Sequence, residues 1–350
     1  MHPLLQKDIR NFTTHCQYGK ELSGSTFLIT GITGLIGSIL AHSLLSLSQD
    51  IRIIAPLRNK SKALAMFDRT ELAQIHFIEC DLCAYDYDAI EHVDYIIHCA
   101  APTSSRYLVE HAVETSTFIY NSTQILLQFA QQHPVKSFVF LSSLEVYGQI
   151  SDDTDSVTED IYGYIDPMIP RSSYPMAKLA AENLCCLYAH EYGVPAKIAR
   201  LTQTTGVGVS FDDDRAVNQF ARKVAFGEDI VLHTRGESAK PYCYTLDAID
   251  AILTIMLRGK DAEAYNVAND ATYISIRQLA EYFRDTYAPA ISLRIEIDES
   301  HGYAPETRLR LSSAKLAHLG WASKYNLKMI FDNLIPWLSS SCRFDKSSKA

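Results

Sequence analysis

The sequence lacks a long hydrophobic run, and no apolar stretch reaches the roughly 20 residues that a membrane-spanning helix needs. It also lacks an excess of positive charge, because 32 Lys and Arg residues stand against 41 Asp and Glu residues, giving a net charge of -9. That balance argues against a protein that binds nucleic acid through a basic surface. Charged residues and a proline interrupt the first dozen positions, so we expect no secretory leader there.

Metal-binding and disulfide patterns are also missing. The eight cysteines are scattered, and the twelve histidines show no clustering of the kind that ligates a metal. Cys80 and Cys83 form one Cys-x-x-Cys pair, but no second pair or neighbouring histidine completes a site. We therefore expect free thiols, no bound metal and a reducing, cytoplasmic location.

The composition and pattern are those of a large α/β protein. Hydrophobic residues make up 47% of the 350 residues and charged residues 21%, which allows a substantial core. Short apolar runs suited to buried strands alternate with segments of helical spacing. This alternation predicts a Rossmann-type, doubly wound parallel sheet. The strands are expected at residues 27–29, 51–55, 76–79, 95–98, 138–141, 197–200 and 265–267.

The character of the chain changes near residue 200, where the predicted segments become shorter. We predict an NAD(P)-binding domain over 1–200, to which 241–268 returns. Residues 201–240 and 269–340 are predicted to form a smaller, discontinuous C-terminal α/β domain that binds substrate, and 341–350 a frayed tail.

Two segments have no assigned task in this division. Residues 1–24 have the spacing of an amphipathic helix that packs against the sheet or a partner subunit, and the sequence does not decide between them. Residues 149–170 are acidic and irregular, which predicts a surface loop or lid.

The strongest local pattern is a glycine triplet between the first predicted strand and the next helix. Gly31 permits a tight turn, Gly34 lets the backbone approach a pyrophosphate, and Gly37 lets helix and strand pack closely. Phosphate oxygens would then lie on the free amides of the helix N-terminus. The cofactor contacts expected in this turn are Gly31, Thr33, Gly34, Leu35, Ile36 and Gly37.

Later strand ends supply further expected contacts. Arg58 follows the second strand, and no acid occurs before Asp68, which favours the 2′-phosphate of NADP over the free ribose of NAD. An ordinary solvated arginine is the alternative. The other expected contacts are Asp81 and Leu82 with adenine, Ala100, Ala101 and Pro102 with the cofactor, and Thr103 and Ser104 with a substrate.

A serine, a tyrosine and a lysine carry the predicted chemistry. Tyr174 and Lys178 are four residues apart and so share one helix face, while Ser143 ends the fifth strand. We expect the ammonium of Lys178 to lower the pKa of Tyr174, which then removes a proton from a sugar hydroxyl as hydride leaves for nicotinamide. The Ser143 hydroxyl would hold the reacting oxygen. Ser142 is the weaker serine candidate. A Tyr-x-x-x-Lys pair alone is common, but its position after a glycine turn and a Ser-Ser strand end favours function.

The runs TGITGLIG, HCAAP, SSLEVYG, YPMAK and KLAHLGW together resemble the extended short-chain dehydrogenase/reductase family, over nearly the whole chain. The resemblance is to its branch of NAD-dependent nucleotide-sugar epimerases and dehydratases. It implies that Ser143, Tyr174 and Lys178 are the catalytic trio, and that the cofactor is NAD, although Arg58 hints at NADP. It also implies a homodimer formed by the helices near 109–131 and 174–192. The residues expected near a nucleoside diphosphate sugar are Gln203, Arg215, Asn218 and Lys240.

Glu145 limits the set of reactions that this site could catalyse. The similar dTDP-glucose 4,6-dehydratases and UDP-glucuronate decarboxylases carry a glutamate there, which could act as a base or orient a water at C5. A structural carboxylate that receives backbone amides is the alternative. The dehydratases also have a preceding aspartic acid, whereas Leu144 cannot donate a proton. Lys240 and Gln203 replace the usual arginine and asparagine, and a lysine cannot grip a diphosphate with two parallel hydrogen bonds.

The resemblance therefore implies oxidation of a nucleotide sugar at C4 with retained NAD(P), followed by a decarboxylase-like or epimerase-like step. A net NADPH-dependent reductase and a 4,6-dehydratase without the usual aspartate are the enzymatic alternatives. A non-catalytic NAD(P)-sensing scaffold is the third.

Overall fold

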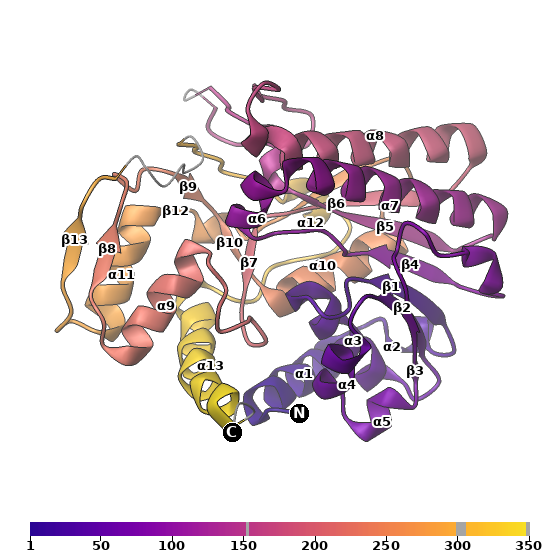
Figure 1. The fold of residues 1–350 in the computed structure, drawn as a ribbon, viewed down its shortest axis with the longest axis horizontal. Coiled ribbons are helices and arrows are strands. Elements are labelled where there is room, and N and C mark those ends of the chain that lie inside the picture. The colour runs from indigo at the N-terminus through magenta and orange to yellow at the C-terminus, as the bar shows by residue number, and fades with distance from the viewer. Residues whose placement is uncertain (152–153, 299–305, 348–350) are drawn as a thin grey trace.

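A computed structural model describes residues 1–151, 154–298 and 306–347. At its centre lies a seven-stranded sheet in the order β11-β6-β5-β4-β1-β2-β3, with every neighbouring pair parallel (Figure 1). The strands are β1 (Thr26–Thr30), β2 (Arg52–Leu57), β3 (Ile75–Glu79), β4 (Tyr95–His98), β5 (Ser137–Ser143), β6 (Ala196–Leu201) and β11 (Ala264–Val267). The predicted Rossmann-type sheet is confirmed.

The strand order reverses beside β1. The chain builds outward from β1 through β2 to β3 and then crosses back to place β4 on the other side of β1. In an open parallel sheet the crevice at the carboxyl ends of two such strands is the usual ligand position. The glycine turn after β1 and the HCAAP run at β4 both fall at this crevice.

Helices cover both faces of the sheet, which explains why its strands are continuously apolar. One face carries α7 (Ala112–Gln132) and α8 (Ser173–Tyr192), and the other carries α3 (Leu35–Leu47) and α10 (Thr245–Arg258) (Figure 1). The short elements between them are α4 (Lys60–Met66), α5 (Arg69–Leu72), α6 (Ser105–Glu110), η1 (Tyr87–Ala89), η2 (Leu144–Tyr147), η3 (Pro170–Ser172) and η4 (Asp270–Thr272).

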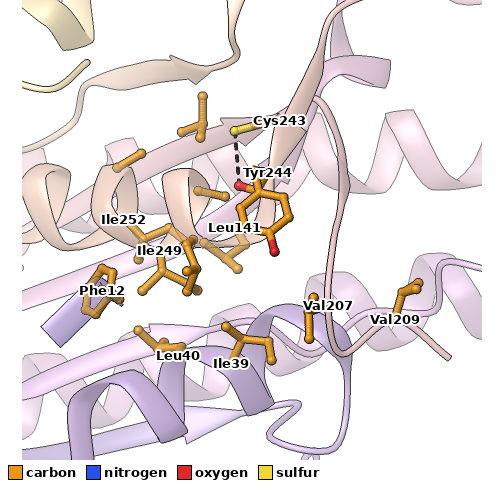
Figure 2. Close-up of a cluster of buried hydrophobic side chains, with 14 of the residues drawn as sticks. Phe12, Ile39, Leu40, Leu141, Val207, Val209, Cys243, Tyr244, Ile249 and Ile252 are labelled. Carbon is orange, nitrogen blue, oxygen red and sulfur yellow. Dashed lines mark hydrogen bonds between the residues drawn. The ribbon is translucent and has the colours of Figure 1, made fainter. Parts of the chain in front are cut away.

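The N-terminal segment is two helices, α1 (Pro3–His15) and α2 (Gly19–Leu22), rather than one. Figure 2 shows Phe12 of α1 beside Leu40 of α3, with Ile249 and Ile252 of α10 close by. All four side chains are buried. The apolar face of α1 is thus covered within this chain, by the helix layer beneath the sheet.

The remaining elements form a smaller group at the side of the sheet (Figure 1). Short strands pair there as β7 (Gln203–Thr205) with β10 (Tyr242–Tyr244), β8 (Ile230–Leu232) with β13 (Leu293–Ile295), and β9 (Ala239–Lys240) with β12 (Ile274–Ser275). The helices are α9 (Ala216–Phe226), α11 (Ile276–Tyr287) and α13 (Leu327–Ser347), whereas α12 (Ala314–Ala317) packs against β11 of the central sheet. The helix α13 continues to Ser347, the frayed tail at 341–350 stays a prediction, and 348–350 lie outside the described residues.

The described residues of the predicted loop at 149–170 are largely irregular, and positions 152–153 lie outside the described residues. Isolated bridges join Gln149 to Tyr164 and Val157 to Leu311. Its side chains Tyr162, Tyr164 and Met168 are 64%, 63% and 85% exposed. Over the ranges given above, no helix has both the length and the apolarity needed to cross a membrane.

Candidate active site

The glycine turn connects the carboxyl end of β1 to α3. Gly31 has φ +69°, and a Cβ at this position would lie 2.9 Å from backbone atoms of Ala100. A Cβ on Gly37 would overlap the carbonyl oxygen of Gly31. Close approach of β1, β4 and α3 therefore requires glycine at both positions.

The first turn of α3 is open to an anion. Its N-cap is Gly34, and no side chain caps the helix, although Gly34 itself donates a backbone hydrogen bond of 2.9 Å to Gly31. The amides of Leu35 and Ile36 are thus among the first-turn donors that an uncapped helix offers. These uncapped amides lie next to a turn whose glycines carry no side chain to block a ligand. The turn therefore suits the pyrophosphate of an NAD(P) cofactor.

A chain of hydrogen bonds fixes the gap between β1 and β4. The Ala100 amide donates to Thr30 Oγ1 at 3.1 Å, Thr30 Oγ1 lies 2.7 Å from His98 Nδ1, and His98 Nε2 lies 3.2 Å from Ser122 Oγ. Burial lowers the pKa of His98 to about 3, so the ring is neutral. If the Thr30 hydroxyl donates to Nδ1, then Nε2–H donates to Ser122. The sequence analysis did not assign His98 this task.

The other predicted cofactor positions follow the ends of their strands. Arg58 lies directly after β2 and is exposed, and Asp81 is exposed while accepting a 3.0 Å hydrogen bond from the amide of Cys83. Leu82 is buried. Ala100, Ala101 and Pro102 are half-buried after β4, and Thr103 and Ser104 are exposed.

The predicted catalytic residues meet at the carboxyl end of β5. Ser143 is its last residue, and Tyr174 and Lys178 lie in the first two turns of α8, with only 7% and 3% of their surfaces exposed. The Ser143 side chain is close enough to the Tyr174 phenol to lower its pKa. Ser142 faces elsewhere, because its hydroxyl donates to the buried Glu182. The catalytic role of Ser143 stays a prediction.

The electrostatics of this trio differ from the expectation. Lys178 Nζ donates to the carbonyl oxygen of Leu141 at 2.7 Å and lies 5.8 Å from the centre of the Tyr174 ring. Burial lowers the pKa of Lys178 to about 8. Burial and the charge of Glu145 raise the pKa of Tyr174 far above its usual value, although Ser143 and nearby arginines lower it. The expected lowering of the Tyr174 pKa is therefore wrong for this structure.

Glu145 is held by an arginine that the sequence analysis missed. Arg171 Nη1 lies 2.9 Å from Glu145 Oε2, and Arg171 Nη2 donates to Oε1 at 3.0 Å. The two side chains are 19% and 31% exposed. Two parallel hydrogen bonds make this a strong, oriented pair. Arg171 lies three residues before Tyr174, about one helical turn, and that spacing was the signal available in the sequence.

Lys240 of β9 is a third charged group at this position. Burial lowers its pKa, Glu145 raises it and Arg171 lowers it, so the three charges are close enough to interact. Arg171, Lys240 and Glu145 together therefore carry an excess of one positive charge when Lys240 is protonated. Such a site suits an anionic substrate group.

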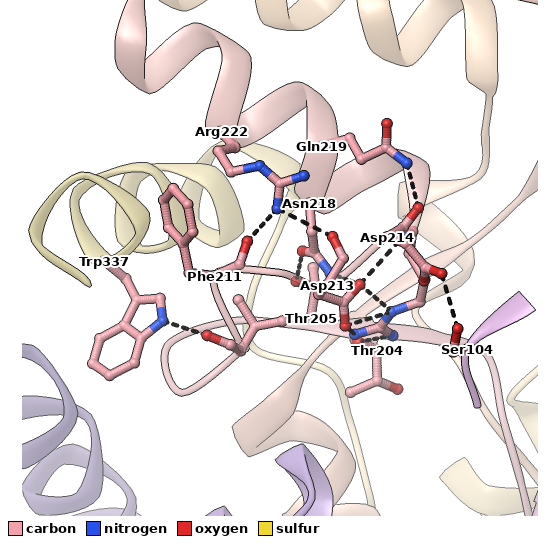
Figure 3. A network of polar contacts seen from close by, with 12 residues as sticks. Ser104, Thr204, Thr205, Phe211, Asp213, Asp214, Asn218, Gln219, Arg222 and Trp337 are labelled. Atoms are coloured by element: carbon pink, nitrogen blue, oxygen red, sulfur yellow. Dashed lines mark hydrogen bonds and ion pairs between the residues drawn. The ribbon is translucent and has the colours of Figure 1, made fainter. Parts of the chain in front are cut away.

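The other predicted substrate residues are engaged within the protein (Figure 3). Arg215 pairs with Asp213 at 2.8 Å and donates to the Thr204 carbonyl at 2.7 Å. Asn218 is fully buried between Thr205 and Asp213, and its assignment as a substrate contact stays a prediction. A buried amide whose partners lie on the neighbouring strand and loop stabilises that loop.

Two further predicted contacts lie close by. Ser104 donates to Asp214 at 3.1 Å and so joins the loop after β4 to the loop before α9 (Figure 3). Gln203 is half-buried in β7, opposite Tyr242 of β10.

A parallel sheet with a glycine turn at its reversal point and a Ser-Tyr-Lys trio beside it defines a dinucleotide-dependent enzyme class. The chain belongs to the NAD dependent epimerase/dehydratase family, whose sequence model matches residues 27–268. The family membership expected from the sequence is confirmed, and α1 lies outside the matched range.

Relatives within the family share similar lengths but modest identity. UDP-glucuronic acid decarboxylase 5 of Arabidopsis thaliana is 26% identical over 311 residues, which cover 87% of each chain. The structure of UDP-glucose 4-epimerase from Thermotoga maritima with UDP-glucose has a TM-score of 0.78 and 21% identity, covering 91% of this chain and 99% of that one. UDP-glucuronic acid 4-epimerase from Bacillus cereus, solved with UDP-glucuronic acid and NAD, has a TM-score of 0.74 and 18% identity, covering 90% and 99%.

Proposed function

We propose that this protein is an enzyme that oxidises a nucleotide sugar at C4 with retained NAD(P), then acts at C5 or C4, and finally returns the hydride. The observation that carries this proposal is the meeting of Ser143, Tyr174 and Lys178 at the carboxyl end of β5, on the edge of the sheet where the glycine turn lies. When bound, the nicotinamide supplies a hydride acceptor. The presence of the entire trio favours catalysis over a scaffold role, which needs none of these residues.

Tyr174 is the proposed base for the C4 hydroxyl, and Ser143 holds the reacting oxygen. Because the resting phenol is strongly protonated, catalysis requires its pKa to fall. Glu145 is one of the two causes that raise this pKa, and Arg171 pairs with Glu145. A substrate that draws Glu145 away from Tyr174 would remove that cause, while Lys178 keeps a cation beside the ring.

Glu145 supports a step at C5, because the C4 ketone acidifies the neighbouring position. Leu144 is buried and apolar, so it offers no acid for loss of a hydroxyl group and disfavours 4,6-dehydration. The positive excess at Arg171 and Lys240 favours a sugar with a C6 carboxylate, the type of substrate named for the glucuronic acid decarboxylase and epimerase relatives. A decarboxylase-like or epimerase-like reaction on a nucleotide uronic acid fits these groups best.

The proposal includes a division of tasks along the chain. Residues 1–200 with 241–268 would hold the cofactor, and 201–240 with 269–340 the nucleotide sugar. The proposed cofactor contacts are those expected from the sequence. Family membership favours NAD as the cofactor, whereas the exposed Arg58 favours NADP. We also propose a cytoplasmic homodimer formed through α7 and α8.

Turnover by the purified protein tests the proposal. UDP-glucuronic acid and UDP-glucose are supplied in turn, and products, carbon dioxide and cofactor absorbance are followed together with the mass spectra of co-purified small molecules. We expect sugar conversion with no net change in cofactor absorbance. Stoichiometric loss of NADPH would indicate a reductase, and cofactor binding without conversion of any nucleotide sugar would indicate a sensing scaffold.

A further inference from the structure

Below the catalytic residues lies a buried ion pair that the proposed mechanism does not use. Arg200 at the end of β6 and Glu182 of α8 are 2% and 6% exposed. Arg200 Nη2 donates to Glu182 Oε2 at 2.7 Å, and Nε lies 3.1 Å and 3.2 Å from the two carboxylate oxygens. The guanidinium continues to Tyr147 Oη at 3.0 Å and to the Glu159 carbonyl at 2.9 Å.

This pair contacts both ends of the segment that carries Ser143 and Glu145. At one end, the Ser142 hydroxyl donates to Glu182. At the other end, the fully buried Tyr147 accepts from Arg200 and donates to Asn266 Oδ1 at 2.7 Å. The segment between these anchors is the strand end and η2, which also carries Glu145 in its half-buried pair with Arg171.

The same pair is connected to the catalytic lysine. Glu182 lies one helical turn after Lys178 on α8, and Lys178 Nζ donates to the carbonyl of Leu141, the residue before Ser142. Glu182 therefore connects the end of β5 to α8, the helix that carries Tyr174 and Lys178. A small shift of either element would change the distance between Ser143 and the phenol.

A buried ion pair contributes little net stability, because desolvation of both charges offsets their attraction. Apolar residues of similar volume would serve the core equally well. We propose that Arg200 and Glu182 are positioning residues, which hold Ser143 and Glu145 in register with Tyr174 and Lys178. This inference rests on the proposed function.

The test variants remove the hydrogen bonds between this ion pair and the Ser142–Tyr147 segment, and each deletes only one hydroxyl group. Ser142→Ala deletes the hydroxyl bound to Glu182, and Tyr147→Phe deletes the one bound to Arg200. We expect each to lower kcat about ten-fold with KM nearly unchanged, because misplacement of reacting groups affects the transition state more than substrate binding. Ser142→Thr retains the hydroxyl and is expected to restore most of kcat. The control is Arg258→Met, which removes an exposed pair with Glu21 and is expected to leave kcat unchanged.

The outcomes separate this inference from the proposed function. Turnover by the wild type together with unchanged kcat in Ser142→Ala and Tyr147→Phe would overturn the positioning role alone. Loss of thermal stability without any change in kcat would also overturn it, by assigning the pair a purely structural task. If the wild type converts no nucleotide sugar, a crystal structure of Ser142→Ala still decides: we expect Ser143 and Glu145 to move relative to Tyr174, and an unmoved segment contradicts the proposal.

Discussion

At the level of single residues, replacement of either Tyr174 or Lys178 tests the proposed chemistry directly. Tyr174→Phe removes the proposed base, and Lys178→Ala removes a cation 5.8 Å from the centre of its ring, so each is expected to lower turnover at least ~100-fold. Steady-state kinetics on a nucleotide sugar provides the measurement. Tyr192→Phe is a matched control, because Tyr192 lies on the same helix and is 50% exposed. Full activity in Tyr174→Phe would exclude the phenol from the reaction.

Glu145 should act after the first oxidation rather than during it. Glu145→Gln keeps the shape of the side chain but removes its basicity, so we expect transient cofactor reduction in a single turnover and no product. Stopped-flow absorbance with product analysis distinguishes the two steps. Glu281→Gln, in an exposed pair with Arg277, is the control. Normal product formation by Glu145→Gln would show that the carboxylate is only structural.

The sequence could identify Tyr174, Lys178 and the glycine turn because their spacing along one element determines their geometry. It could not show that Arg171 pairs with Glu145, since these residues are brought together by packing of α8 against the end of β5. Nor could it show that Asp213 engages Arg215 and Asn218, because loop conformation decides that contact. The pKa of Tyr174 was mispredicted for a related reason: spacing reveals the nearby lysine but not the extent of burial.

At the level of elements, the buried strands were predicted well because their apolar runs are a local property. The partners of α1 were not, because they are distant in sequence. Asp8 on the buried face of α1 accepts a hydrogen bond from Tyr244, and Asn11 donates to Tyr325 Oη at 2.9 Å. Both contacts join this N-terminal helix to residues more than 200 positions away.

Asp8 gives this helix a pH-dependent stability. Burial raises the pKa of Asp8 from 3.8 to about 6, against lowering by Tyr244 and Lys7. The folded state therefore binds this proton more tightly than the unfolded state, and the free energy of unfolding falls as pH rises from about 4 to about 6. Asp8→Asn keeps an acceptor for Tyr244 without the charge. We expect it to stabilise the protein by roughly 1–3 kcal/mol at pH 7 and to have little effect below pH 4.

Urea unfolding at several pH values measures this difference. Asp50→Asn, a change at an exposed position, is expected to leave the free energy of unfolding nearly unchanged at each pH. A constant offset between Asp8→Asn and the wild type across the whole range would contradict the linkage to Asp8.

For the whole molecule, the sheet order places α7 and α8 together on an outer face, where large apolar side chains are exposed. Val113 of α7 is 81% exposed, Tyr120 of α7 is 38% exposed, and Leu187 of α8 is 48% exposed. Exposed apolar side chains spread along both helices suit the proposed dimer contact. A two-fold axis beside α7 and α8 would bring the two copies of these helices together in one self-complementary contact.

A charge in such a contact is repeated by the symmetry. Val113→Glu and Leu187→Glu would each bring two carboxylates into the proposed interface. We therefore expect each variant to be a monomer at micromolar concentration, where the wild type is expected to be a dimer. Size-exclusion chromatography with light scattering measures the mass. Met168→Glu is the control, because Met168 is 85% exposed on the 149–170 loop and lies on neither helix. A dimer that survives both helix substitutions would place the interface elsewhere, and a monomeric wild type would mean that these apolar residues face solvent in the active enzyme.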